Sequence, residues 1–236
     1  MIYELRFYQI TRGRMSDMNA RFNQSLITDL LPRNGVPCVG AWNSLAGPAG
    51  PRFVYLMAFR DFAHREEAWG SFYVDPEWAR VRAETNAGHE MVERHDLFFL
   101  KPNAAWQLDA SAGQAVRTGE VHELVMQQLA PGQQAGANEF LEGTWLPQLR
   151  AAGARTLGVF DMVGGNNMQQ IVMFHAWPDA SAWQRGTVAA ETASDVTEAL
   201  LAQRMKIGQA VFARAEVNLL VPVPGTLIQP ALGRVP

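Results

Sequence analysis

The chain repeats itself once, and this repeat limits its folding more than any other feature. Residues 2–5 (Ile-Tyr-Glu-Leu) return 119 positions later as residues 121–124 (Val-His-Glu-Leu). Further matches keep the same order at offsets of 118 to 120: residues 35–42 with 153–160, 59–61 with 177–179, and 100–102 with 220–222. The chain therefore consists of two copies of one module.

The modules are placed at residues 1–104 and 119–222 of the 236-residue chain. The linker, residues 105–118, is rich in Ala, Gly, Ser and Gln and has no apolar period. The tail, residues 223–236, contains three prolines, so it is predicted to be neither a helix nor a central strand. It is either loose or lies across a neighbouring surface.

Each module alternates strand and helix signals in the same order. In the first, strands are predicted at residues 2–10, 36–43, 53–59 and 95–100, a helix at residues 16–30, and helical structure starting at residues 61 and 75. This β-α-β-β-α-β order is the ferredoxin-like unit, an antiparallel sheet with helices on one face. The strands are apolar on both faces, so the predicted fold is α+β, with two such modules forming an intramolecular barrel.

Four motifs of the first module carry a resemblance to a known family. They are Tyr-Glu-Leu-Arg at 3–6, Gly-Ala-Trp at 40–42, Phe-Arg-Asp at 59–61 ahead of Arg65, and Asp-Pro-Glu-Trp at 75–78. In this order they resemble the NIPSNAP family along nearly the whole first module. The resemblance implies the dimeric α+β barrel superfamily, which includes cofactor-independent monooxygenases, isomerases, haem-binding enzymes and binding proteins. The second module resembles the family less, because Val125 replaces Arg6 and the Asp-Pro-Glu-Trp motif is missing.

The first strand holds the leading candidates for chemistry. Glu4 and Arg6 are two residues apart, so they share a face at about 7 Å from each other, and Tyr8 follows on that face. Inside the expected barrel, a buried carboxylate needs a partner, which Arg6 can supply. The pair is either an acid or base beside a cation in a ligand cavity, or a structural ion pair that fixes how the sheets dock.

Aromatic residues and one histidine complete the candidate set. Trp42, Tyr55, Phe59 and Trp78 either line a pocket for a flat apolar ligand or belong to the core. His175 interrupts an apolar run, so it should be buried and needs a hydrogen-bond partner. It is a general base, a haem ligand or a satisfied core group. Glu4, Arg6 and His175 are the candidate catalytic residues.

Several classes of function find no support in the sequence. The single cysteine, Cys38, allows no intrachain disulfide, and the histidine spacing fits no metal motif, so neither metal nor cofactor is expected. A net charge of −3 does not favour nucleic acid or an anionic membrane as partner. No apolar run of 18 residues occurs, and a charge at Glu4 argues against a signal peptide. We expect a cytoplasmic homo-oligomer.

The sequence thus predicts a NIPSNAP-like barrel protein that binds a small apolar or aromatic molecule. If it is an enzyme, cofactor-independent proton transfer or oxidation suits these side chains, with Glu4 or His175 exchanging the proton and Arg6 and Tyr8 stabilising negative charge. The alternative is a non-catalytic protein-interaction or scaffold module with a solid barrel core.

Overall fold

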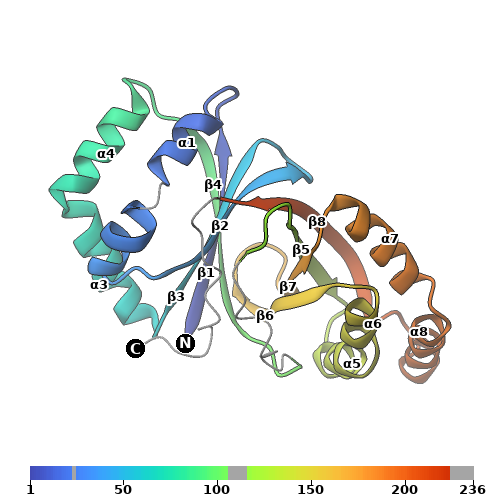
Figure 1. Ribbon diagram of the computed structural model, residues 1–236. Helices are drawn as coiled ribbons and strands as arrows, with labels where there is room; N and C mark the ends of the chain where they lie inside the picture. The colour runs from blue at the N-terminus through green and yellow to red at the C-terminus, as the bar shows by residue number, and fades with distance from the viewer. Residues whose placement is uncertain (23–24, 106–115, 224–236) are drawn as a thin grey trace. The chain divides into compact units, whose positions relative to one another are not determined.

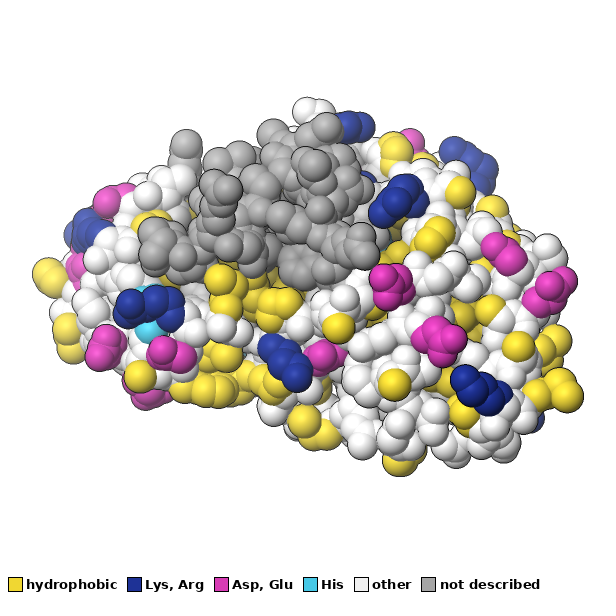
Figure 2. Space-filling view, turned by 90° about the horizontal axis from the view of Figure 1, so that it is seen from below, with side chains coloured by type: hydrophobic (Ala, Val, Ile, Leu, Met, Phe, Trp, Pro, Cys, Tyr) yellow, Lys and Arg dark blue, Asp and Glu magenta, His cyan; other side chains and the backbone are white. Residues whose placement is uncertain are grey.

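The computed structural model describes residues 1–22, 25–105 and 116–223. Most of the predicted linker and all of the predicted tail beyond Val223 lie outside these residues. Within them, no helix is both long and apolar enough to cross a membrane. On the face shown in Figure 2, acidic and basic side chains are interspersed.

The first module contains four strands and the helical segments that cover them (Figure 1). Its elements are β1 (Ile2–Ile10), α1 (Met15–Arg21), the π-helical turn η1 (Leu26–Leu30), α2 (Leu31–Arg33), β2 (Cys38–Ala46), β3 (Arg52–Phe59), α3 (Phe62–Val74), α4 (Pro76–Asn86) and β4 (Val92–Pro102). The β-α-β-β-α-β order predicted for this module is confirmed.

The second module repeats the same order. Its elements are β5 (Val121–Leu129), α5 (Gln134–Phe140), the π-helical turn η3 (Leu141–Trp145), α6 (Leu146–Ala151), β6 (Arg155–Gly164), β7 (Gln170–Trp177), α7 (Ala180–Glu191), α8 (Ser194–Ile207) and β8 (Phe212–Pro222). The described residues separate into two compact units, residues 1–22 and 25–99 with 221–223, and residues 100–105 with 116–220.

The strands follow the order β1-β3-β2-β8-β5-β7-β6-β4, which closes on itself as an eight-stranded barrel. The predicted α+β barrel is therefore confirmed. In the first module β1 runs antiparallel to β3, with Ile2 opposite Phe59 and Arg6 opposite Tyr55. In the second, β5 and β7 pair in the same way, with Val121 opposite Trp177. The repeat seen in the sequence thus extends to strand register.

The segment predicted as one helix at residues 16–30 is divided. The described residues form α1, then the π-helical turn η1, and then the short α2, which continues past Pro32 to Arg33. The π-turn shifts the helical face by part of a turn, and this shift keeps Leu26, Ile27 and Leu30 all buried. Proline is tolerated here because it occupies the first turn of α2.

Two aspartates fix where the helices that cover the first sheet begin. Asp61 precedes α3 and its carboxylate accepts a hydrogen bond from the backbone N–H of His64 at 2.8 Å. Asp75 precedes α4 and accepts from the N–H of Glu77 at 2.8 Å, with Pro76 in the first turn. Both are N-caps that satisfy otherwise unpaired N–H groups. They set the residues at which α3 and α4 begin.

Candidate functional site

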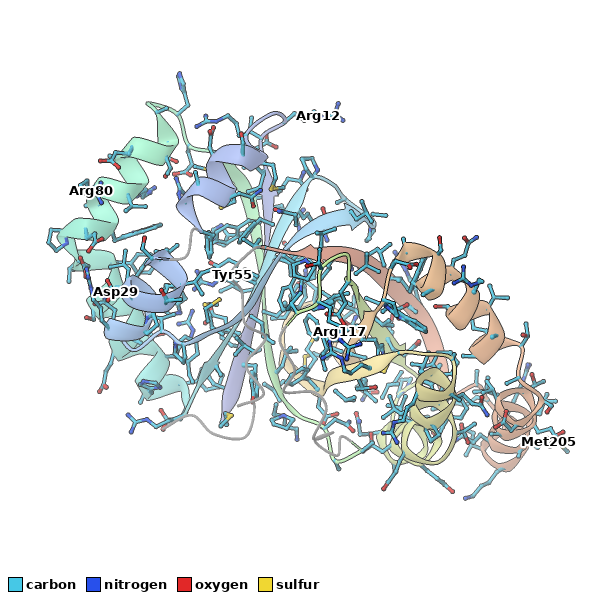
Figure 3. All side chains as sticks on the ribbon, in the orientation of Figure 1. Arg12, Asp29, Tyr55, Arg80, Arg117 and Met205 are labelled. Carbon is cyan, nitrogen blue, oxygen red and sulfur yellow. The ribbon has the colours of Figure 1, made fainter. Side chains whose placement is uncertain are left out.

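A pocket of about 330 Å³ lies between the sheet of the first module and its helices. Its lining comes from β1, β3 and β4 on the sheet side and from α1, η1, α2, α3 and α4 on the helix side: Arg6, Tyr8, Arg21, Phe22, Leu26, Leu31, Tyr55, Trp69, Phe72, Tyr73, Trp78, Arg82, Glu90, Val92 and His95. Tyr55 is seen on the helix side of the sheet in Figure 3. Seven of these fifteen side chains are Phe, Tyr or Trp and three are Leu or Val, so the walls are mainly apolar and rich in aromatic rings.

Arg6 is the charged group at the floor of the pocket, and it is only 5% exposed. Its Nη1 donates to the hydroxyls of Tyr8 at 3.1 Å, Tyr55 at 3.2 Å and Tyr73 at 3.5 Å. Its guanidinium carbon lies 4.1 Å from the ring centroid of Trp69, a cation–π contact. Three phenols and one indole therefore converge on a single guanidinium.

Glu4 binds Arg6 and orients it from outside the pocket. This fully buried carboxylate accepts hydrogen bonds from the Nε atoms of Arg6 and Arg65, and from Nε1 of Trp69 at 3.3 Å. Glu4 does not belong to the pocket lining. A buried carboxylate is stable only when it is paired and hydrogen-bonded, and these three donors satisfy Glu4. The pair predicted from the sequence exists, and it orients Arg6.

The face that carries these residues is turned toward the helices of the same module. We expected Glu4, Arg6 and Tyr8 to face the barrel interior, and this was wrong. Helix α3 covers this face: its Arg65 and Trp69 donate to Glu4. The hydroxyl of Tyr73, also on α3, accepts from Arg6. Alternation along one strand shows which residues share a face, but it does not show which face the helices cover.

The protonation states of two groups follow from their surroundings. Burial alone would lower the pKa of Arg6, but Tyr55, Tyr8 and Glu4 more than offset this, so its pKa is raised and the group stays charged. Burial raises the pKa of Tyr55 well above its usual value, although Arg6 opposes this effect. Tyr55 is therefore protonated at neutral pH, and it donates to the hydroxyl of Tyr8 at 2.5 Å.

A second group of cations lies at the helical side of the pocket. Arg21 is 3% exposed, donates from Nε to the Thr85 hydroxyl at 2.9 Å, and has its guanidinium carbon 5.7 Å from the Trp78 ring. Burial lowers its pKa, which Glu90 partly counteracts. Arg82 is exposed and donates to Glu90 at 2.9 Å. Glu90 is the single carboxylate among the lining residues.

The other predicted ligand-binding residues divide into two groups. Tyr8, Tyr55 and Trp78 line the pocket together with Arg6. Phe59 packs against Trp69 in the core, with ring centroids 6.3 Å apart, and does not reach the pocket. Trp42 is fully buried beside Gly40, where an added Cβ would come within 2.4 Å of its ring, and it is also absent from the lining.

His175 belongs to β7 of the second module, whereas all residues that line the pocket belong to the first module. It is fully buried, with Nδ1 3.3 Å from the Thr156 hydroxyl. Within the described part of the chain, its Nε2 has no hydrogen-bond partner. Burial lowers the pKa of His175 to about 4, so the imidazole is neutral at pH 7. Its directly opposite neighbour on β5 is Glu123.

Sequence reasoning missed several residues of the pocket: Arg21, Phe22, Trp69, Phe72, Tyr73, Arg82, Glu90 and His95. A signal for some of them was present. Trp69, Phe72 and Tyr73 follow the i, i+3, i+4 spacing that places side chains on one helical face. His95 was considered only for metal spacing. Across the described residues, no cluster of His, Cys, Asp and Glu side chains could hold a metal ion.

The second module has lost the polar centre of this site. At the positions that correspond to Arg6, Tyr55 and Trp78, it has Val125, Met173 and Val196, which pack in its hydrophobic core. Glu123, the counterpart of Glu4, accepts hydrogen bonds from Trp177 at 3.2 Å and Trp183 at 2.9 Å. Within the described residues, Glu123 forms no ion pair, so this copy of the carboxylate holds no arginine.

Comparison with solved structures relates the fold to known proteins. A candidate monooxygenase from Lactobacillus acidophilus has a TM-score of 0.60 at 11% identity, covering 94% of this chain and 93% of that one. An anthrone oxidase-like protein has a TM-score of 0.54 at 10% identity, covering 96% and 94%. A chlorite dismutase from Candidatus Nitrospira defluvii has a TM-score of 0.50 at 9% identity, covering 96% and 93%. At these identities the likeness shows a shared fold.

A search of curated proteins finds no match. An uncharacterized NIPSNAP domain protein from Burkholderia xenovorans matches at 22% identity and a TM-score of 0.39, covering 45% of this chain and 99% of that one. The NIPSNAP family model matches residues 3–105, which is the module that contains the pocket. Residues 3–105 therefore form a NIPSNAP domain, as the motifs of the sequence predicted.

Proposed function

We propose that the NIPSNAP domain binds one small, largely aromatic molecule that carries an oxygen acceptor, in the pocket between its sheet and its helices. The observation that supports this function best is the combination of aromatic walls with a buried guanidinium at the floor. Ligand sites are typically apolar concavities with a few well-placed polar groups. The pocket favours this function over that of a scaffold with a filled core.

The size of the pocket selects a small ligand. Its volume of about 330 Å³ lies near the lower end of the range for ligand sites, which suits a molecule of one or two rings. The side chains of Trp69 and Trp78 form part of the aromatic wall against which such rings can pack. Arg6 and Tyr8 offer hydrogen-bond donors, because the Tyr8 hydroxyl already accepts from both Arg6 and Tyr55 and keeps its own proton to donate.

The same donors suit proton-transfer chemistry. When a proton leaves a carbon or a hydroxyl of the ligand, negative charge develops on oxygen, and preorganised donors stabilise that charge. Arg6 and Tyr8 take this role, as expected from the sequence. Glu4 is shielded behind Arg6 and His175 belongs to the other module, whereas His95 lines the pocket, so we propose His95 as the group that accepts the proton.

Calorimetric titration with two probes, 2-naphthol and 2-naphthoate, tests the binding function. We expect saturable binding of one molecule per chain for at least one probe. Val92, which lines the pocket at the start of β4, is then replaced: Val92→Trp fills the space and should weaken binding at least about tenfold.

The matched control for this change is Val163→Trp, because Val163 lies on β6 of the second module, is 39% exposed and is absent from the lining. This variant should bind as the unaltered protein does. The function is contradicted if neither probe binds, or if Val92→Trp binds as tightly as Val163→Trp.

A further inference from the structure

We propose that the ligand of this pocket is an aromatic acid with a single negative charge, held with its acidic oxygens on Arg6 and Tyr8 and its ring against the aromatic walls of the pocket. This inference rests on the proposed function and specifies its substrate class. It concerns the charge of the ligand, which the aromatic walls alone do not determine.

The arginine side chains in the ion pairs around the pocket outnumber the carboxylates by one. Arg6 and Arg65 both bind Glu4, and Arg65 also binds Glu66. On the helical side, Arg82 binds Glu90 at 2.9 Å, and Nη1 of Arg21 lies 4.0 Å from the same carboxylate. Four guanidinium groups thus share three carboxylates. The excess is one positive charge, which a ligand with one negative charge balances.

The arrangement of donors leads to the same conclusion. Arg6 uses Nε for Glu4 and Nη1 for the three tyrosine hydroxyls. None of these contacts uses Nη2, and no other described residue bonds to it. A buried guanidinium with an open N–H edge favours an oxygen anion, because charged hydrogen bonds are shorter and stronger than neutral ones. Arg21, by contrast, already donates to Thr85 and Asn86.

The surroundings of Arg6 explain why the acid should be aromatic. Its guanidinium plane is bounded by Trp69 at 4.1 Å and by the Tyr55 ring at 5.8 Å, measured from the guanidinium carbon to each centroid. Any group that reaches the open edge therefore lies beside aromatic faces. A flat ring attached to the acidic group fills this space with favourable ring contacts, whereas a compact inorganic anion would leave it unfilled.

The experiment compares two probes that differ in charge and have the same ring system. At pH 7 the carboxylate of 2-naphthoate is ionised, while 2-naphthamide is neutral and has nearly the same shape. Calorimetric titration of the full chain should give at least about tenfold tighter binding of the acid than of the amide. Raising the salt concentration should reduce this preference, because part of it is electrostatic.

Two kinds of variant locate the preference. Arg6→Gln removes the proposed anchor and should bring the affinities for acid and amide to within about threefold. Because Arg6→Gln also removes a partner of the buried Glu4, a second variant is needed. Arg82 is exposed, so the Arg82→Gln protein should fold normally, and its preference for the acid should fall several-fold. Its control is Arg80→Gln on the same helix, an exposed residue bound to Glu84 outside the pocket (Figure 3).

The outcomes separate this inference from the function on which it rests. A preference for the acid that falls in Arg6→Gln or Arg82→Gln but not in Arg80→Gln supports an acidic ligand. Equal binding of acid and amide, or a preference that no variant alters, overturns the inference and leaves aromatic binding intact. If 2-naphthoate, 2-naphthamide and 2-naphthol all fail to bind, the proposed function itself is contradicted.

Discussion

At the scale of single residues, Glu4 and its counterpart Glu123 show how one position acquires different roles. Both are buried and both accept hydrogen bonds from indole N–H groups. Glu4 also binds two arginines, whereas burial raises the pKa of Glu123 despite its bonds to Trp183 and Trp177. The first is therefore a counter-ion and the second mainly a hydrogen-bond acceptor.

This difference predicts unequal costs for the same substitution. Glu4→Gln leaves Arg6 buried with a charge that is no longer balanced, and we expect a loss of about 3–5 kcal/mol in the free energy of unfolding. Glu123→Gln keeps only one of the two oxygens that accept from Trp177 and Trp183, so one indole N–H loses its acceptor, and the free energy of unfolding should fall by about 1–2 kcal/mol. Urea denaturation of both variants at pH 7 measures the difference. Equal losses would mean that Glu4 is not the counter-ion of Arg6.

How far the site could be predicted also depends on single residues. Strand alternation correctly put Glu4, Arg6 and Tyr8 on one face. It could not show that α3 covers that face, and so Arg65, Trp69 and Tyr73 were not connected to it. Spacing along one element is a local property, whereas the meeting of β1 with α3 depends on tertiary packing of segments about 60 residues apart.

At the scale of elements, the two glycines at the strand bulges have a packing role. The pairing of β2 with β3 shifts register between Cys38 and Gly40, and that of β6 with β7 shifts between Thr156 and Gly158. At each glycine an added Cβ would lie within 2.6 Å of the aromatic ring two residues on. The bulge lets that ring fold back over its own strand, which explains the Gly-x-aromatic motif repeated in both modules.

Alanine at these glycines should therefore destabilise the fold. Gly40→Ala forces the buried Trp42 ring to move, and Gly158→Ala does the same to Phe160, at a cost of about 1–3 kcal/mol each. Gly70→Ala is the control, because Gly70 lies within α3 with open space around its Cβ position. It should stabilise by up to about 1 kcal/mol. Destabilisation of all three by similar amounts would exclude the proposed packing role.

The element boundaries show which parts of the fold are local. The succession of strands and helices along the chain and the hairpins were predictable, because alternating apolar residues and turn-forming residues are local signals. The division of residues 16–30 into α1 and the π-turn η1 was not, because apolar residues at Leu26, Ile27 and Leu30 fit a regular helix nearly as well. The π-turn exists because the core beneath it accepts all three side chains.

At the scale of the whole molecule, the repeat produces two modules of one fold with different interiors. The first retains a charged pocket, while the second fills the equivalent positions with Val125, Met173 and Val196. Closure of the strand order through both copies was predictable from the repeat. The loss of the polar centre could be predicted from Val125 and from the missing Asp-Pro-Glu-Trp motif, which supplies Trp78 in the first module. The second module instead buries a neutral histidine at the position that Met57 occupies in the first.

That histidine should make the stability of the whole chain sensitive to acid. The pKa of His175 is lowered by burial to about 4, against about 6.5 when the chain is unfolded. Below pH 6.5 the imidazole takes up a proton in the unfolded chain but not in the folded chain, which favours unfolding. The stability is therefore complete above pH 6.5 and falls as the pH approaches 4. Between pH 7.5 and pH 4.5 this loss is about 2–3 kcal/mol.

Replacement by the residue of the first module isolates this contribution. His175→Met should lose about 2–3 kcal/mol less than the unaltered protein over the same pH range, since the titrating group is gone. His122, whose pKa is also lowered by burial, remains in both proteins and accounts for part of the residual slope. Denaturation by urea at pH 7.5 and pH 4.5 gives the four free energies required. If the two proteins lose equal stability, the imidazole of His175 is accessible to protons in the folded chain, and its burial does not control its charge.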